Sequence, residues 1–276
     1  MASADEGGEK SLQSADIVYR RVGHKGADAI STGNTIESFE SAVSHGVDMI
    51  EFDVLRAREG RLIVAHDREE ARRRRALDLS EVLDAFCEPP LDRVEFDCDL
   101  KLPGREAELA GAIAGRGLIE RAMVSTMEVD SLVKLRQLEP DLRLGWTYPK
   151  TRRDWTQYGW ARLGVIAGLA ALRRRFPKTL AEQAPRLDVD AVWVYHHVIS
   201  HRLLEVADEV GVELIAWTVD DLGRMTDLIE LGVHGICSND PRLFEPAEQA
   251  AASKAAPAPE PAGPEEIADE AEPQEG

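Results

Sequence analysis

Short apolar segments alternate with helical patterns along most of this chain of 276 residues, and this alternation limits the fold more than any single motif does. The segments expected as strands are 17–23, 48–54, 94–101, 121–125, 142–147, 190–194, 213–217 and 235–238. Helical patterns lie between most of them, at 36–45, 105–115, 128–138, 157–175, 200–210 and 221–231. Strands joined by helical crossovers pair in parallel, so the pattern predicts an α/β fold, a (β/α)8 TIM barrel. A doubly wound open sheet is the alternative, but no glycine-rich phosphate turn follows the first strand.

The barrel is expected over residues 17–245, with one accessory strand at 61–65 in the loop after the second strand. Residues 1–16 and the Ala-, Pro- and Glu-rich tail 246–276 have almost no large apolar side chains. Such segments cannot bury enough surface to offset the entropy lost on ordering, so both are predicted to be disordered.

The net charge of −18 is carried largely by these two ends. Residues 1–16 have four acidic side chains and one lysine, and residues 246–276 have eight and one. The remaining body is only mildly acidic, which argues against a protein that binds duplex nucleic acid through a basic face.

The compartment is expected to be the cytoplasm. Cys87, Cys98 and Cys237 are scattered and odd in number, which is typical of a reducing environment rather than of a disulfide framework. The N-terminal residues lack the basic and apolar regions of a signal peptide, and no run approaches the roughly 20 apolar residues that span a bilayer.

Polar side chains recur at the carboxyl ends of the expected strands, which is where barrels of this kind carry their chemistry. They are His24 after the first strand, Glu51 and Asp53 on the second, His66 and Asp67 after the accessory strand, Asp99 and Lys101 on the third, Ser125 on the fourth, Trp217 on the seventh, and Ser238 and Asn239 on the eighth. His196 and His197 follow the sixth strand, where they face either the mouth or solvent. The recurrence from strand to strand predicts a site at this end of the barrel.

Glu51 and Asp53 are two residues apart on one strand, so they point to the same side. Burying two carboxylates together is costly unless a cation or a proton lies between them. With Asp99 they would supply three oxygen ligands, which suits Mg²⁺ or Ca²⁺ better than zinc. Asp97 lies on the same face, either as an ion-pair partner of Lys101 or as the ligand instead of Asp99.

Two histidines beside such a metal, His24 and His66, could act as general base and general acid. Lys101 would add positive charge for an anionic substrate. A metal, a lysine and two histidines are suited to cleaving a phosphodiester, because the metal and lysine neutralise the phosphate while the histidines move protons.

The motifs that carry these residues resemble, in order, the glycerophosphodiester phosphodiesterase family. They are His24-Lys25-Gly26, Asn34-Thr35, Ser38-Phe39, Gly46–Val54, Val64–Asp67, Asp99-Leu100-Lys101, Ser125, Ala216–Asp220 and Gly235–Pro241. The resemblance covers roughly residues 18–244 and, as an ordered set, is more specific than any single motif.

The resemblance implies a metal-dependent barrel that hydrolyses glycerophosphodiesters to glycerol 3-phosphate and an alcohol. By position, Glu51, Asp53 and Asp99 would bind the metal, and His24 and His66 would be the acid/base pair. Lys25 and Lys101 would contact phosphate, and Trp217 would line the glycerol pocket.

The chain departs from the family pattern at several positions. Lys25 stands where the family has Arg, which loses a bidentate contact with phosphate; Gly33 and Asp99 stand where it commonly has Glu. The segment between His66 and Asp99 is short, with Arg72–Arg75 in place of a longer insertion, and this arginine run is expected to be a solvated face. The Asp at 99 is also similar to phospholipases D of the sphingomyelinase D type, but the closing motifs favour the first family.

Residues 155–176 combine Trp and Tyr with an apolar centre and an Arg flank. They predict either a helix packed on the barrel or an interfacial helix on a membrane, too short to span it. The second possibility would fit a lysophospholipase D-type enzyme acting on a lysolipid. A third possibility is a barrel that binds a phosphorylated ligand without turnover, although a pure binder would not need His24 and His66.

Overall fold

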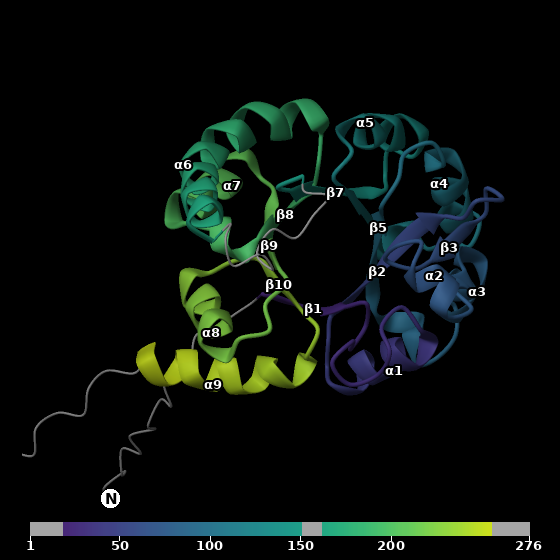
Figure 1. The fold of residues 1–276 in the computed structure, drawn as a ribbon, viewed down its shortest axis with the longest axis horizontal. Helices are drawn as coiled ribbons and strands as arrows, with labels where there is room; N and C mark the ends of the chain where they lie inside the picture. Colours follow the sequence, from purple (N-terminus) through teal and green to yellow (C-terminus); the bar gives the residue numbers. More distant parts are fainter. Residues whose placement is uncertain (1–18, 151–161, 256–276) are drawn as a thin grey trace, which may run out of the picture.

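A computed structural model of the chain describes residues 19–150 and 162–255 and confirms the closed barrel (Figure 1). Its eight parallel strands are β1 (Arg20–His24), β2 (Met49–Arg56), β5 (Glu95–Leu100), β6 (Ala122–Thr126), β7 (Arg143–Tyr148), β8 (Ala191–Tyr195), β9 (Glu213–Trp217) and β10 (Gly235–Ser238). The ring closes because β1 pairs with both neighbours: Val22 lies opposite Met49 of β2 and Cys237 of β10. The expected strands therefore agree with the observed ones to within a few residues.

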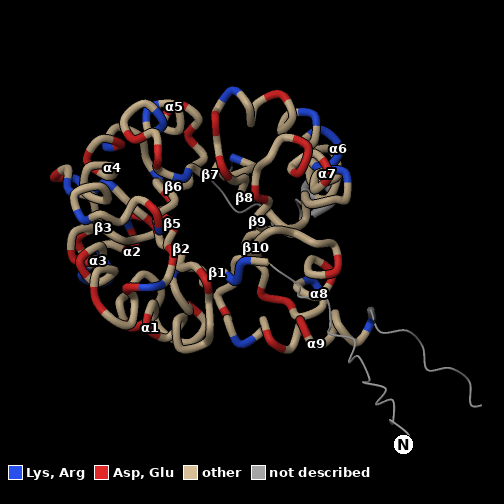
Figure 2. Tube along the Cα trace, turned by 180° about the vertical axis from the view of Figure 1, so that it is seen from behind, with Lys and Arg blue, Asp and Glu red and all other residues tan. Residues whose placement is uncertain are grey.

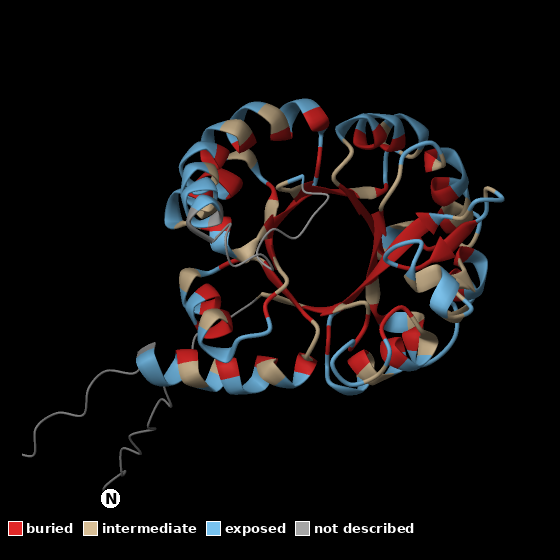
Figure 3. Cartoon of the chain, viewed as in Figure 1, coloured by how far each residue is buried: buried red, intermediate tan, exposed pale blue. Residues whose placement is uncertain are grey.

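Helices surround the strands and bury their outer face (Figure 3). They are α1 (Ile36–Ser44), α4 (Glu106–Ala114), α5 (Val129–Leu138), α6 (Arg162–Leu187), α7 (His201–Val210), α8 (Leu222–Leu231) and α9 (Phe244–Ala255). Several ends follow local signals: the Ser200 side chain caps α7 by accepting from the Leu203 amide, and Gly211 and Gly232 end α7 and α8 in the left-handed region.

An accessory hairpin occupies the loop after β2. It consists of β3 (Leu62–Val64), which pairs antiparallel with β2, and β4 (Leu77–Asp78), which pairs with β3. The short helices α2 (Glu70–Arg73) and α3 (Leu79–Ala85) complete it. Only the first of these strands is predicted from the sequence, because the other elements are too short to show a period.

The inside of the barrel is packed in layers. The middle layer contains a small apolar cluster that includes Met49, Trp193 and Ile215. Gly145 leaves room for the Trp193 indole, since a Cβ at position 145 would lie 2.6 Å from Trp193 Nε1. This layer separates the carboxyl ends of the strands from the amino ends, where Arg20 and three other charged side chains form ion pairs.

The tail is a correction to the sequence prediction. Disorder from residue 246 is wrong for residues 246–255, which belong to α9 and pack against α8. Ala247 and Ala251 are buried one turn apart, so beyond Phe244, which is also buried, the helix packs on the barrel through small side chains. Glu248 accepts hydrogen bonds from Tyr19 and Arg21 and ties α9 to β1. Residues 1–16 and 256–276 lie outside the described residues.

The helix expected over 157–175 runs instead from Arg162 to Leu187, while residues 155–161 lie outside the described part of the chain. It continues because Phe176, Leu180 and Ala184 recur every fourth residue and are buried. Among residues 19–150 and 162–255, no helix is both long and apolar enough to cross a membrane. Acidic and basic residues are interspersed around the ring of helices (Figure 2).

Candidate active site

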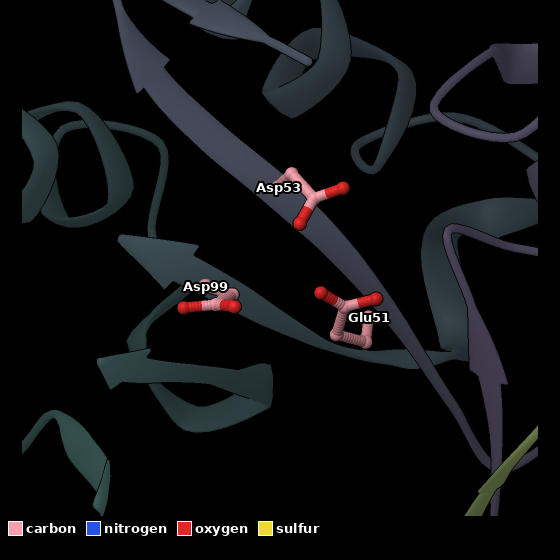
Figure 4. A group of neighbouring side chains, drawn as sticks. All are labelled: Glu51, Asp53 and Asp99. Atoms are coloured by element: carbon pink, nitrogen blue, oxygen red, sulfur yellow. The ribbon is translucent and has the colours of Figure 1, made fainter. Parts of the chain in front are cut away.

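Three buried carboxylates meet at the carboxyl ends of β2 and β5 (Figure 4). Glu51 and Asp53 point to the same side of β2, and the parallel register places Asp99 of β5 opposite Asp53. One oxygen from each of the three lies within 4.8 Å of the others. Strand parity thus brings together the three residues predicted as metal ligands.

The electrostatics of this group depend on Lys101, which follows β5. Its Nζ lies 2.5 Å from Asp53 Oδ1 and also contacts Asp99 Oδ2. Burial would raise the pKa of Asp53, but the charges of Lys101, His66 and His24 lower it below its usual value. Burial and the neighbouring Asp53 raise the pKa of Glu51 to about 8. One ammonium group therefore does not compensate all three carboxylates.

The donor set fits a hard divalent cation. It consists only of carboxylate oxygens, the ligands that Mg²⁺ and Ca²⁺ prefer. Asp53 Oδ1 is buried and has no aligned hydrogen-bond donor in the described chain, despite its charge contact with Lys101. An acceptor of this kind, buried beside two other carboxylates, is suited to a metal ion.

Asn34 holds Asp53 from the loop after β1. Its Nδ2 donates to Asp53 Oδ2 at 2.8 Å, and its Oδ1 accepts from the Asp53 amide at 3.1 Å. Asn34 adopts a left-handed backbone conformation with a φ of 59°, which Asn tolerates better than most residues. The Asn34-Thr35 motif was a signal for this residue, but the contact with Asp53 could not be predicted from it.

His24 is held from one side by a chain of two polar residues. Its Nδ1 lies 2.6 Å from Asn239 Oδ1, and Asn239 Nδ2 donates to Asp220 Oδ2 at 2.6 Å. The Asp220 carboxylate can only accept, so Asn239 turns its Nδ2 toward Asp220 and its Oδ1 toward the His24 ring. The neutral imidazole of His24 therefore carries its proton on Nδ1. Its Nε2, 3.8 Å from Glu51 Oε2, then bears the lone pair, and burial lowers the pKa of His24.

His66 lies on the loop after β3, and its side chain is 52% exposed. Its backbone amide donates to Glu70 Oε2 at 2.7 Å, and its Nδ1 lies 3.4 Å from Asp67 Oδ2. The charges of both His66 and His24 lower the pKa of Asp53, so both rings lie close enough to act electrostatically on the carboxylate group. The two rings differ in access to water, because His24 is far more buried.

Two departures from the family pattern prove to be linked. Lys25, with a φ of 50°, directs its Nζ to within 3.4 Å of Asp28 Oδ2. A Cβ at Gly33 would lie 2.5 Å from Asp28 Oδ1, so the Asp28 carboxylate fills the space of a side chain at position 33. Gly33 therefore permits a close approach that a glutamate there would prevent.

Asp97 is distinct from the carboxylate group. It accepts a hydrogen bond from Ser125 Oγ at 2.6 Å, and burial raises its pKa well above the usual value. Among the described residues, the ion pairs of Lys101 are with Asp53 and Asp99, so the ion pair expected between Asp97 and Lys101 is absent there.

An aromatic group lies at the ends of β8 and β9. Trp217 packs on the apolar cluster inside the barrel, and its ring centroid is 5.6 Å from that of Tyr195. Trp217 Nε1 is buried without a hydrogen-bond partner in the part of the chain that the structure describes. His196 and His197 are adjacent to Tyr195, with His196 half-buried and His197 exposed.

Known glycerophosphodiester phosphodiesterases are similar to this chain in sequence and in fold. A glycerophosphodiester phosphodiesterase from Caldanaerobacter subterraneus is 25% identical over 255 residues, which are 81% of this chain and 95% of the relative. A crystal structure of a glycerophosphodiester phosphodiesterase from Parabacteroides distasonis has a TM-score of 0.63 at 17% identity, covering 86% of this chain and 98% of that one. An Oleispira antarctica phosphodiesterase, solved with the product sn-glycerol-3-phosphate, has a TM-score of 0.62 at 16% identity and covers 84% and 97%.

The family comparison covers nearly all of the barrel. The model of the glycerophosphoryl diester phosphodiesterase family matches residues 24–100 and 104–243, which span β1 to β10 and include the carboxylate group and both histidines. The chain belongs to the glycerophosphoryl diester phosphodiesterase family, a family of phosphoric diester hydrolases.

Proposed function

We propose that this protein hydrolyses glycerophosphodiesters to glycerol 3-phosphate and an alcohol, with a divalent metal held by Glu51, Asp53 and Asp99. The observation that carries the proposal is the buried carboxylate group flanked by His24 at the end of β1 and His66 on the loop after β3. Family membership and the glycerol 3-phosphate bound to the Oleispira relative support this substrate class.

A bound Mg²⁺ or Ca²⁺ would supply positive charge that stabilises the phosphate oxygens as the diester reacts. Lys25 and Lys101 lie beside the same carboxylates and would add charge for the phosphate. The Trp217 N–H, free of other partners in the described chain, would donate to a substrate oxygen. These residues bind and orient the diester without exchanging protons with it.

The two histidines would move the protons. His24 presents an unprotonated Nε2 in the tautomer that Asn239 imposes, which supports its role as the base that takes a proton from the oxygen that forms the new bond to phosphorus. That oxygen comes from water, either directly or in a second step in which water opens the cyclic phosphate left by attack of a substrate hydroxyl, so one water is consumed per diester. His66 would give its proton to the oxygen of the alcohol as the phosphorus–oxygen bond breaks. Because its ring is exposed, His66 can exchange protons with water between turnovers.

The test is release of glycerol 3-phosphate from glycerophosphocholine and glycerophosphoethanolamine, measured with Mg²⁺, with Ca²⁺ and with chelator. Metal-dependent turnover is expected, and a His66→Ala variant should lose about 10²-fold or more in kcat. His201→Ala, a change at an exposed histidine on α7, is the control and should retain full activity. Absence of turnover with either cation, or full activity of His66→Ala, would contradict the proposal.

Contact with a membrane surface is a second candidate, favoured by the first half of α6. Gly164, Ile166, Ala167 and Gly168 are exposed, Ile166 at 55%, and Arg173–Arg175 follow them on the exposed surface. An apolar helix surface with a basic flank suits an anionic lipid surface. Choline release from lysophosphatidylcholine and flotation with liposomes would test this candidate, and failure of both would remove it. A cytoplasmic location stays a prediction from the sequence.

A further inference from the structure

The four arginines at 72–75 do not behave alike, although the sequence predicts one solvated face. The side chain of Arg73 is 76% exposed and pairs with Glu69, which is 70% exposed. The side chain of Arg74 is only 22% exposed and pairs with Glu70, which is 25% exposed. Both pairs have the same i,i+4 spacing, so the difference lies in what else Arg74 and Glu70 contact.

Arg74 reaches the loop after β1. Its Nη2 donates to the Gly33 carbonyl at 2.9 Å, and its Nη1 donates to the Asn34 carbonyl at 3.3 Å. These two carbonyls lie on either side of the Asn34 Cα, so the contacts hold the backbone of Asn34 in place. The Asn34 side chain in turn hydrogen-bonds both the backbone amide and the carboxylate of Asp53. The guanidinium therefore supports a predicted metal ligand through one intervening residue.

Glu70 reaches the loop that carries His66. Its Oε1 accepts from Arg74 Nη2 at 2.5 Å, while its Oε2 accepts from the His66 amide at 2.7 Å. Two loops that are 32 residues or more apart in the sequence are thus joined through one ion pair. Arg74 Nε is buried with no partner in the described chain, a cost that the other contacts of Arg74 must offset.

We propose that Arg74 and Glu70 are positioning residues that fix the His66 loop and the Asn34–Asp53 contact relative to each other. The inference rests on the proposed function, since it takes His66 as the acid and Asp53 as a metal ligand. Neither side chain needs to touch the substrate. In this chain, which lacks the longer insertion, the pair would give the short segment after β3 a fixed position beside the carboxylates.

The matched test compares Arg74→Gln with Arg73→Gln, two changes one residue apart that each remove an i,i+4 ion pair. Arg74→Gln should lower kcat and weaken Mg²⁺ binding, each by about 10-fold or more, with a smaller change in KM. Arg73→Gln should leave all three unchanged. Mg²⁺ binding is measured by titration calorimetry on the substrate-free protein, so this readout does not depend on turnover.

Two further variants separate positioning from loss of folding. Arg74→Lys keeps the charge beside Glu70 but lacks the planar fork that reaches two carbonyls, so its kcat and Mg²⁺ affinity should lie between those of the wild type and Arg74→Gln. The double variant Glu70→Gln/Arg74→Gln should lose little more kcat and Mg²⁺ affinity than Arg74→Gln alone, because both changes break the same connection. Thermal unfolding verifies that each variant is folded.

Equal kcat and equal Mg²⁺ affinity in Arg74→Gln and Arg73→Gln would overturn the inference, while turnover by the wild type would leave the proposed function intact. If the wild type hydrolyses no diester, the proposed function fails, and the Mg²⁺ titrations still decide the inference. A weaker affinity in Arg74→Gln alone would then support the connection from Arg74 to Asp53, and equal affinities would refute it.

Discussion

The side-chain amide of Asn239 lies between a histidine and a carboxylate, and these neighbours determine which of its atoms faces which. Asp220 receives two hydrogen bonds from Asn239, one from the side-chain Nδ2 and one from the backbone amide at 2.9 Å. The amide oxygen is left to accept from His24 Nδ1. Asp220 therefore controls the His24 tautomer without touching the ring.

Asp220→Asn should lower kcat by about 10²-fold, because an amide at 220 can donate as well as accept and no longer fixes the orientation of Asn239. KM should change much less, since neither residue is placed at the phosphate. Nitrogen-15 NMR of the histidine rings should show His24 with its proton shared between Nδ1 and Nε2.

The control is Asp221→Asn, which removes a neighbouring carboxylate that caps α8 instead of bonding Asn239. This control should keep both kcat and the His24 tautomer, with only a modest loss of stability. If Asp220→Asn keeps the wild-type NMR signature and kcat, the chain from Asp220 to His24 has no catalytic effect.

The sequence predicts which carboxylates of the site share a face, but it does not predict the contacts that the loop residues make. Glu51, Asp53 and Asp99 share a face because strand parity follows from apolar periodicity. The contacts of Asn34 and Arg74 depend on loop conformations, including the φ of 59° at Asn34. Loop conformations leave no periodic pattern in the sequence from which they could be predicted. Their partners lie 19 and 41 residues away, so composition alone does not indicate them.

Among the elements, the strands were predicted best and the small helices least well. The strands contain compact runs of apolar residues, such as Ala191–Tyr195, between polar turns. In contrast, after Phe244 the buried residues of α9 are alanines, and α6 contains Pro177 and Pro185, which usually end a helix. Packing of Phe176 and Leu180 stabilises α6 beyond the point where local propensity would end it.

The short turn η5 (His196–Val198) holds a histidine whose titration should affect stability. Burial, followed by the charges of His197 and Arg224, lowers the pKa of His196 to about 4. The unfolded chain, with a pKa near 6.5, then binds more protons than the folded one between about pH 6.5 and pH 4. Stability contributed by the neutral ring is therefore complete above pH 6.5 and is lost as the pH falls through this window.

His196→Gln should remove part of that dependence. Urea unfolding at pH 7 and pH 4.5 should show a smaller loss of unfolding free energy in His196→Gln than in the wild type. His201→Gln, at an exposed histidine on α7, should leave the loss unchanged. Identical pH dependence in all three proteins would mean that His196 titrates in the folded state as it does in the unfolded chain.

In the barrel as a whole, the groups of the candidate site lie at one end and a ring of ion pairs lies at the other. The carboxylates, histidines and lysines of the site occupy the carboxyl ends of the strands. At the amino ends, Arg20 and Arg143 each contact both Glu95 and Glu213, which joins β1, β5, β7 and β9 in a ring of ion pairs. The apolar cluster around Trp193 lies between the two ends and insulates one from the other.

Replacing a member of this ring should therefore change stability and leave catalysis intact. Arg143→Leu leaves Glu95 and Glu213 with Arg20 as the remaining cation of the ring and should lower the unfolding free energy by about 1–3 kcal/mol. The carboxylates at the opposite end keep their contacts with Lys101, so kcat and KM should stay within about twofold of the wild type. Urea unfolding and steady-state kinetics on the same preparation give both numbers. A fall in kcat in a fully folded preparation would show that the two ends are coupled through the interior cluster. The ring contacts of Arg143 are with Glu95 and Glu213 and do not reach the site.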